Sequence, residues 1–223
     1  MTSVNYERMI DHTYLKPEAT TKEIDKLIAE AKQYNFKTVC VNASYVEYAK
    51  KALANTEVGI TCVIGFPLGV MNSNVKAFEA LDAINRGADE IDMVLHIGKL
   101  KEKEYDYVLE DIKAVKAAIG KHILKVIIET ALLTKEEIIK ATEIVMASGA
   151  EFIKTSTGFS TRGASLEDIQ IMKSVCGDKL LIKAAGGISV KDDMVKMHIA
   201  GATRFGTSRS VAILEGKASS GGY

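Results

Sequence analysis

Charged side chains interrupt three short segments that otherwise have the composition of buried strands. Asp92, Lys154 and Lys183 lie in the apolar stretches 90–94, 151–155 and 180–184. Strands of a parallel sheet are covered on both faces and normally contain Val, Ile and Leu without interruption. Because side chains alternate between the faces of a strand, Ile153 and Ile182 can face covering helices while both lysines face the other side. We therefore expect the two lysines and Asp92 to meet.

A pair of buried lysines points to amine chemistry. Burial lowers the pKa of a lysine because a medium of low dielectric constant disfavours the ammonium, and a second ammonium nearby lowers that pKa further. Lys154 would then be a neutral amine at neutral pH, the form that attacks a carbonyl carbon to give a Schiff base. Lys183 would remain the cation, and Asp92 would pair with the lysines or carry protons.

The alternative is structural. The lysines could extend to water from a strand end, or form an ion pair with Asp92 that has no chemical role. A further lysine, Lys125, shows that a lysine in a predicted strand is not by itself evidence of a lysine in the site. It lies at the start of its predicted strand, and we expect it to face solvent at the opposite end of the sheet.

Two glycine-bearing turns offer a place for an anion. Paired glycines let backbone N–H groups approach an anion closely, and the start of a following helix adds its dipole. The turn after Lys183 and the turn near residue 206 therefore predict a phosphate site, with the alternative of two tight turns and a helix cap. The segment 155–159 after Lys154, with Thr155 and Gly158, could line the same space. The candidate phosphate ligands are Gly186, Gly187, Gly206, Ser208 and Arg209.

Strands alternate with helices along the whole chain. The helical period over Thr21–Tyr34 places Ile24, Leu27, Ile28 and Ala31 on one face. Thr134 with Glu137, and Ser165 with Asp168, have the spacing of capping boxes that begin helices; the first begins Lys135–Ser148, and Ser189 precedes a further helix, Val190–His198. The predicted strands are Asp11–Tyr14, Thr38–Val41, Gly59–Ile64, Glu90–Val94, Leu124–Ile128, Phe152–Thr155, Leu180–Ala184 and Arg204–Phe205.

Three helices end on a similar phrase. Gly87, Gly149 and Gly201 each precede an alanine and then a strand, as glycine does at a left-handed helix end. The recurrence indicates repeated αβ units, and eight of them predict a compact (β/α)₈ TIM barrel, an α/β fold, rather than an open sheet. Residues 1–217 would form this one domain, and 218–223 a flexible tail ending in Tyr223. In such barrels the chemistry lies at the C-terminal mouth, where the lysines and Asp92 would point.

Composition excludes several classes of protein. Of 223 residues, 47% are hydrophobic and 26% charged, and 29 basic side chains balance 29 acidic ones, so nothing predicts disorder, bulk nucleic-acid binding or attachment to an anionic membrane. Glycine-rich nucleotide motifs are lacking. The three cysteines and four histidines have neither disulfide nor metal-ligand spacing, so we expect no metal and no cofactor. Without a signal peptide or an apolar span in the sequence, we expect a cytoplasmic protein.

The motifs, in this order, resemble the deoxyribose-phosphate aldolases of the Schiff-base-forming class I. The resemblance covers nearly the whole chain, and the segments around Lys154 and Lys183 are its specific part. The segments that carry it are Asp11-His12-Thr13, Cys40-Val41-Asn42, Gly65-Phe66-Pro67-Leu68-Gly69, 90–94, Lys125-Val126-Ile127-Ile128-Glu129-Thr130, 152–159, 183–188 and the terminal tyrosine.

The resemblance implies a reaction and a set of roles. The reaction is the reversible cleavage of 2-deoxy-D-ribose 5-phosphate to D-glyceraldehyde 3-phosphate and acetaldehyde, without metal. Lys154 would form the imine, Lys183 would be the second catalytic lysine, and Asp92 would donate and accept protons. Further residues implied in the site are Asp11 and Thr13 in the substrate and relay network, Gly186, Gly187 and Ser208 at the phosphate, and Tyr223 in proton exchange.

Several alternatives remain open from the sequence. Cys40 would lie near the substrate by the resemblance, although its apolar surroundings favour a packed thiol. The chain could be another Schiff-base phosphosugar aldolase or a transaldolase-like barrel, a metal-dependent aldolase or isomerase, or a phosphosugar-binding barrel without activity. We expect a homo-oligomer, a dimer or a tetramer, although no surface patch identifies the partner face.

Overall fold

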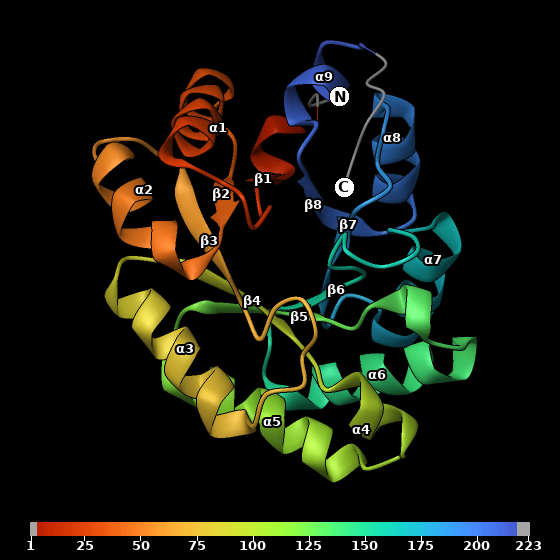
Figure 1. The fold of residues 1–223 in the computed structure, drawn as a ribbon. Coiled ribbons are helices and arrows are strands. Elements are labelled where there is room, and N and C mark those ends of the chain that lie inside the picture. Colours follow the sequence, from red (N-terminus) through yellow and green to blue (C-terminus); the bar gives the residue numbers. More distant parts are fainter. Residues whose placement is uncertain (1–3, 218–223) are drawn as a thin grey trace.

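A computed structural model describes residues 4–217 and shows a closed barrel of eight parallel strands in sequential order. Figure 1 looks at the barrel with the helices arranged around its strands. The (β/α)₈ prediction is confirmed. The strands are β1 (Ile10–Thr13), β2 (Thr38–Val41), β3 (Gly59–Ile64), β4 (Glu90–Val94), β5 (Ile123–Ile127), β6 (Phe152–Lys154), β7 (Leu181–Ala185) and β8 (Ala202–Thr207).

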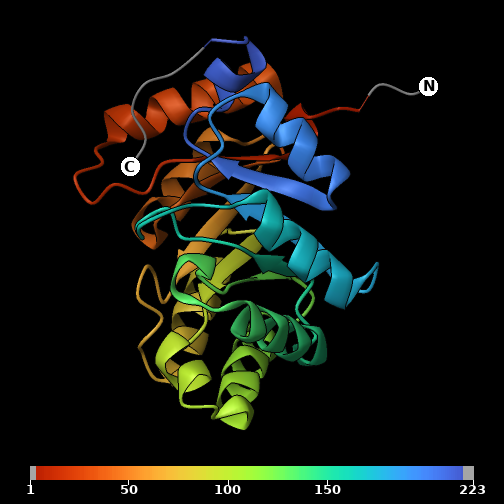
Figure 2. The same ribbon diagram turned by 90° about the vertical axis from the view of Figure 1, so that its right-hand side faces the viewer.

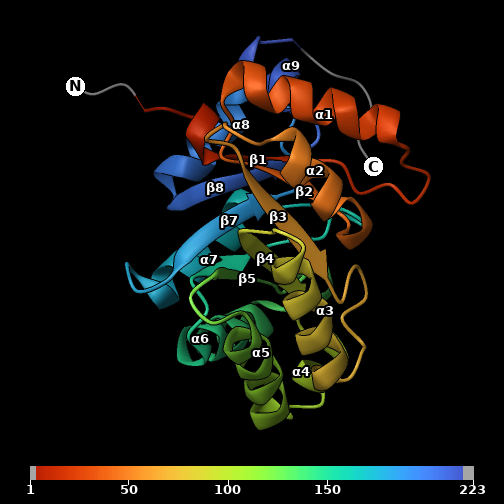
Figure 3. The same ribbon diagram turned by 90° about the vertical axis from the view of Figure 1, so that its left-hand side faces the viewer.

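The helices cover the outside of the barrel, as the two side views show (Figures 2 and 3). Short 3₁₀ helices η1 (Glu7–Met9), η2 (Ala43–Tyr45) and η3 (Thr130–Leu132) join some of the elements. The α-helices are α1 (Thr21–Tyr34), α2 (Val46–Ala52), α3 (Ser73–Asn85), α4 (Ile97–Lys101), α5 (Tyr105–Ile119), α6 (Lys135–Ser148), α7 (Leu166–Cys176), α8 (Lys191–Ile199) and α9 (Ser210–Leu214).

The main hydrophobic core lies between the strands and this helical layer. On α1 the four residues predicted to share a face, from Ile24 to Ala31, are all buried. The outward-facing Ile153 and Ile182 belong to the same core. Thr134 and Ser165 form the predicted capping boxes with Glu137 and Asp168. Local sequence thus determines where these helices begin and which side they bury.

Strand ends differ from the predictions by a residue or two, and most at the barrel seam. β8 extends over Ala202–Thr207, whereas composition predicted only Arg204–Phe205. The added residues include Gly206 and Thr207, which have weak strand character but pair with Asp11 and His12 of β1. Closure of the barrel, a long-range contact, therefore determines the length of β8. Similarly, α8 begins at Lys191 rather than Val190, which is its N-cap residue.

The register of the parallel strands places the charged residues of neighbouring strands side by side. Lys154 of β6 pairs with Lys183 of β7, and Asp92 of β4 pairs with Lys125 of β5. Paired residues of neighbouring parallel strands point to the same face of a sheet. Because inward and outward side chains alternate along each strand, one choice of face brings all of these charges into the barrel lumen.

A buried ion pair connects two of the outer helices. Lys76 of α3 lies with its Nζ 2.6 Å from Oδ2 of Asp111 on α5, and neither side chain has any exposed surface. The two helices lie side by side in Figures 1 and 3. Breaking such a pair leaves an uncompensated buried charge, whereas replacing both members with apolar groups is often tolerated.

We therefore expect Lys76→Met to lower the free energy of unfolding by roughly 3–5 kcal/mol, because Asp111 loses its partner. Urea denaturation followed by circular dichroism would measure the change. The double variant Lys76→Met/Asp111→Leu should regain most of the loss. A single variant as stable as the parent chain would show that the pair contributes nothing.

Within residues 4–217, no helix combines the length and the apolar character that crossing a membrane requires.

Candidate active site

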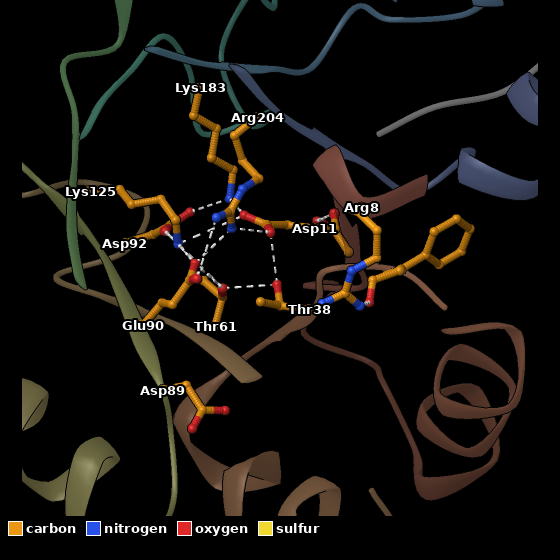
Figure 4. Close-up of polar contacts among 12 residues, drawn as sticks. Arg8, Asp11, Thr38, Thr61, Asp89, Glu90, Asp92, Lys125, Lys183 and Arg204 are labelled. Carbon is orange, nitrogen blue, oxygen red and sulfur yellow. Dashed lines mark hydrogen bonds and ion pairs between the residues drawn. The ribbon is translucent and has the colours of Figure 1, made fainter. Parts of the chain in front are cut away.

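Ion-paired side chains fill the inside of the barrel, and Figure 4 shows most of them converging from different strands. We call the following residues the lumen network: the carboxylates Asp11, Glu90 and Asp92, and the cations Lys125, Lys154, Lys183 and Arg204. Thr38 and Thr61 donate or accept hydrogen bonds at its edge, and all members are buried.

Asp92 lies at the centre of the upper part of this network. Its Oδ2 is 2.7 Å from the Nζ atoms of both Lys154 and Lys183, and its Oδ1 is 2.8 Å from Nζ of Lys125. The predicted meeting of Asp92 with the two lysines is therefore present. Because both ammonium groups contact the same oxygen of Asp92, the negative charge of this carboxylate is divided between Lys154 and Lys183.

The two lysines differ in their surroundings, and their pKa values shift in opposite directions. Burial lowers the pKa of Lys154, and the charge of Lys183 lowers it further, against the opposing effect of Asp92. Burial also acts on Lys183, but Asp11 and Asp92 together outweigh it and raise the pKa of Lys183. Lys183 touches both carboxylates, whereas Lys154 contacts Asp92 alone within the network. Lys154 is thus the lysine suited to be an amine nucleophile, and Lys183 the one suited to remain charged.

The prediction for Lys125 is wrong. Its side chain is fully buried, with Nζ 2.6 Å from Oε2 of Glu90 and 2.8 Å from Oδ1 of Asp92. A position near a strand start does not mean exposure, because the inward face of β5 is determined by its pairing with β4. The carboxylates of β4 compensate the ammonium and raise the pKa of Lys125 in spite of burial.

Glu90 and Arg204 were also missed. The guanidinium of Arg204 lies 2.8 Å from Oδ1 of Asp11 and 2.8 Å from Oε2 of Glu90, and it stacks 5.1 Å from the ring of Phe152. The sequence held a signal for both residues. Glu90 lies two residues before Asp92 and therefore on the same face of its strand, and Arg204 is a charged residue inside a predicted strand.

A cavity of about 260 Å³ opens at the C-terminal ends of the strands, next to Lys154. The predicted residues Thr13, Gly158, Gly186, Gly187, Gly206, Ser208 and Arg209 all line it. The lining residues that were not predicted include a run directly after the 155–159 segment: Ser160, Thr161, Arg162 and Gly163.

Glycine is required where two mouth loops touch. Gly186 and Gly187 have φ of 71° and 72°, in the left-handed region. A Cβ on Gly163 would lie 2.2 Å from the carbonyl carbon of Gly186, so the two backbones pack without intervening side chains. The loops after β6 and β7 therefore form one wall, and their backbone groups border the cavity.

Some predicted residues lie beneath or beside this cavity. Thr155 is buried, and its Oγ1 accepts a hydrogen bond from the backbone N of Ala185, so it joins the end of β6 to the end of β7. Cys40 is buried and packs in a small apolar cluster with Leu15 and Val63, and burial raises the pKa of its thiol. Asp11 lies in the lumen network. Tyr223 is outside the described residues, so its role stays a prediction.

Comparison with known proteins places the chain in a family. Residues 8–215 match the DeoC/LacD family of aldolases. The chain belongs to this family. The deoxyribose-phosphate aldolase of Mycoplasmopsis synoviae is 63% identical over 215 residues, covering 95% of this chain and 96% of the relative. That of Staphylococcus carnosus is 53% identical over 220 residues, covering 99% of this chain and all (100%) of the relative.

Solved structures agree with the family. A crystal structure described as a putative deoxyribose-phosphate aldolase from Coccidioides immitis has a TM-score of 0.93 and 46% identity, with 95% of this chain and 85% of that chain covered. The deoxyribose phosphate aldolase from Aeropyrum pernix, described as a unique tetramer, has a TM-score of 0.86 and 31% identity, with 94% and 89% covered. This chain is therefore an aldolase, an enzyme that cleaves or forms a carbon–carbon bond.

The candidate site of this aldolase has two parts. The lower part is the ion-paired lumen network, and the upper part is the open cavity at the mouth. In the upper part Arg162 is held by Asp168, with N–O distances of 2.5 and 3.1 Å, and it also donates to the carbonyl of Thr130. The cavity thus has a fixed guanidinium in its wall. Across residues 4–217, no cluster of His, Cys, Asp and Glu has the arrangement of a metal site.

The shared carboxylate gives a prediction about pH in this aldolase. The variant Lys183→Met removes a cation that lowers the pKa of Lys154 and frees Oδ2 of Asp92 for Lys154 alone, so both effects raise that pKa. Since an amine reacts only when unprotonated, trapping of acetaldehyde on Lys154 by cyanoborohydride should begin at higher pH than in the parent enzyme, by about one pH unit or more. Peptide mass mapping across pH measures the midpoint.

The control for this experiment is Lys179→Met, which removes an exposed lysine elsewhere. Its midpoint should equal that of the parent. A midpoint in Lys183→Met that stays unchanged or moves to lower pH would contradict the electrostatic coupling of the two lysines.

Proposed function

We propose that this aldolase reversibly cleaves 2-deoxy-D-ribose 5-phosphate to D-glyceraldehyde 3-phosphate and acetaldehyde through a Schiff base on Lys154. The observation that carries the proposal is the position of Lys154. Lys154 lines the mouth cavity, its side chain is buried, and its amine shares one oxygen of Asp92 with a second lysine. Burial lowers the pKa of Lys154, which increases the fraction of neutral, nucleophilic amine at a given pH. The relatives named deoxyribose-phosphate aldolase support the choice of substrate.

The chemical steps use the groups at the lumen. The neutral amine of Lys154 adds to C1 of the open-chain sugar, and loss of water gives an iminium. Removal of the proton on the C3 hydroxyl breaks the C2–C3 bond, releases glyceraldehyde 3-phosphate, and moves the bonding pair into the iminium as an enamine. Protonation at C2 and hydrolysis then release acetaldehyde and the free amine. Asp92 would accept and donate the protons in these steps, and Lys183, whose Nζ lies 2.7 Å from Oδ2 of Asp92, would supply the positive charge beside it.

The phosphate of the substrate would lie at the mouth loops. Gly186, Gly187 and Ser208 border the cavity, and Arg162 and Arg209 line the same space. This arrangement follows the usual position of phosphate in such barrels, in the loops after strands 7 and 8. Gly206 has a further role, because a Cβ there would lie 3.1 Å from Cε of Lys183. Its lack of a side chain leaves room for the second lysine.

Borohydride trapping tests the Schiff base directly. Incubation with 2-deoxy-D-ribose 5-phosphate and sodium borohydride should inactivate the enzyme and leave one adduct, which peptide mapping should place on Lys154. Lys154→Leu should form no adduct and should have no measurable cleavage, whereas the surface variant Lys113→Leu should behave as the parent. An adduct on Lys183 would mean that the roles of the two lysines are exchanged. Cleavage without any adduct would exclude the imine.

A charge pair of variants tests the phosphate site. Ser208→Asp places a carboxylate at the exposed edge of the cavity, and Ser208→Asn places a neutral group of nearly the same shape there. We expect the Asp variant to raise KM for 2-deoxy-D-ribose 5-phosphate about tenfold or more relative to the Asn variant, by charge repulsion. Rates with unphosphorylated deoxyribose should be alike in both. Equal KM values for the phosphosugar would place its phosphate elsewhere.

A further inference from the structure

The charges of the lumen network balance only if one of its four basic side chains is uncharged. Among residues 4–217, the network holds three carboxylates and four basic side chains. Lys125, Lys183 and Arg204 match Asp11, Glu90 and Asp92 in number. A proton on Lys154 would therefore give a water-poor compartment a net positive charge, which is strongly unfavourable.

The lower carboxylates are already occupied by cations other than Lys154. Oε2 of Glu90 lies 2.6 Å from Nζ of Lys125 and 2.8 Å from Nη1 of Arg204. Oδ1 of Asp11 lies 2.8 Å from the same Nη1, and Oδ2 of Asp11 accepts from Lys183. Figure 4 shows these side chains gathered around one another from opposite walls of the barrel.

Asp92 is the one carboxylate of the network that Lys154 contacts. Its Oδ1 binds Lys125, and its Oδ2 binds Lys183 at 2.7 Å as well as Lys154. Lys154 therefore shares an oxygen that another ammonium already neutralises. It is also the network member that borders the mouth cavity, so an incoming carbonyl group meets this amine first.

We propose that Arg204 and Glu90 are positioning residues that act on the charge of the Lys154 amine from below and in opposite directions: Arg204 favours its uncharged form, and Glu90 opposes it. This inference rests on the proposed role of Lys154 as nucleophile. Neither Glu90 nor Arg204 lines the mouth cavity, so neither is a catalytic residue.

The titratable groups that face Lys154 come from several strands. Asp92 of β4 and Lys183 of β7 face its amine, and the thiol of Cys40 on β2 is nearby but neutral, since burial raises the pKa of Cys40. The pKa values of the more distant network members shift so as to keep them charged; these are Asp11 on β1, Glu90 on β4, Lys125 on β5 and Arg204 on β8. Arg162 and Arg209 line the mouth on the solvent side of Lys154.

Charge balance predicts opposite effects of two substitutions. Arg204→Met leaves the network one cation short, and the most basic site able to take up a proton is the amine of Lys154, so its pKa rises. Glu90→Gln leaves one cation in excess, and the least stabilised proton is again the one on Lys154, so its pKa falls. The double variant restores the balance and should return the pKa close to that of the parent.

The test measures the amine itself and needs no substrate. The full-length enzyme is labelled with a trace of acetic anhydride at a series of pH values, and peptide mapping gives the pH midpoint of acetylation at Lys154. We expect a midpoint about one pH unit higher in Arg204→Met and about one unit lower in Glu90→Gln, since a charge at close range shifts a pKa by about 1–3 units. The double variant should lie within a few tenths of a unit of the parent.

Two controls separate charge from damage. Arg204→Lys keeps the cation but loses the forked geometry, and should leave the midpoint nearly unchanged. Asp111→Asn removes a charge from the buried pair with Lys76 between α3 and α5, outside the barrel, and should not move the midpoint at all. If Arg204→Met does not fold, the near-isosteric Glu90→Gln still decides the matter through the direction of its shift.

Single variants that shift the midpoint in the same direction, or not at all, would overturn the proposal. The result is also distinct from the fate of the proposed reaction. A parent enzyme that fails to cleave 2-deoxy-D-ribose 5-phosphate, but shows the opposite shifts, would refute the substrate and leave the charge balance intact. Normal cleavage by the parent enzyme, with an acetylation midpoint of Lys154 that does not change in the variants, would support the substrate and refute the charge balance.

Discussion

The structure depends on the requirement that a closed, water-poor barrel lumen remain close to electrical neutrality. Ions taken out of water lose several kcal/mol each after relaxation, unless partners at hydrogen-bond distance replace the water. The lumen of this barrel meets that requirement with carboxylates from β1 and β4 and cations from β5, β7 and β8. Lys154 from β6 has no carboxylate oxygen of its own in the network, because the oxygen that it contacts, Oδ2 of Asp92, also contacts Lys183.

The barrel architecture brings this constraint to the candidate active site. Every strand contributes inward side chains, so groups distant in sequence meet at the axis, as Asp11 and Arg204 do. The strands end at the mouth, where the loops after β6, β7 and β8 surround a cavity that reaches Lys154. The lower lumen is closed and ionic, and the upper lumen is open and polar. Lys154 lies at the boundary between the two parts, and in our proposal its uncharged amine is favoured by the network below and reacts with a carbonyl group that enters from the cavity above.

Much of this could be predicted from the sequence because the determining signals are local. The capping boxes at Thr134 and Ser165, the buried face of α1 and the glycines that end three helices depend on residues within a few positions of one another. Charges in apolar strands marked Asp92, Lys154 and Lys183, since a buried charge in a parallel strand needs a partner. The family resemblance then connected these residues to the loops of the mouth.

The sequence by itself thus determined the alternation of elements, the barrel class and the residues most suited to amine chemistry. Tertiary structure decided which charges meet. Lys125 was expected to face solvent but points inward, because the pairing of β5 with β4 sets its face. Arg204 lies in a strand whose length is determined by closure against β1, and its partners come from β1 and β4. The pairs Lys125–Asp92 and Arg204–Asp11 join residues 33 and 193 positions apart, and such pairings give no periodic pattern in a sequence because they arise only when the barrel closes.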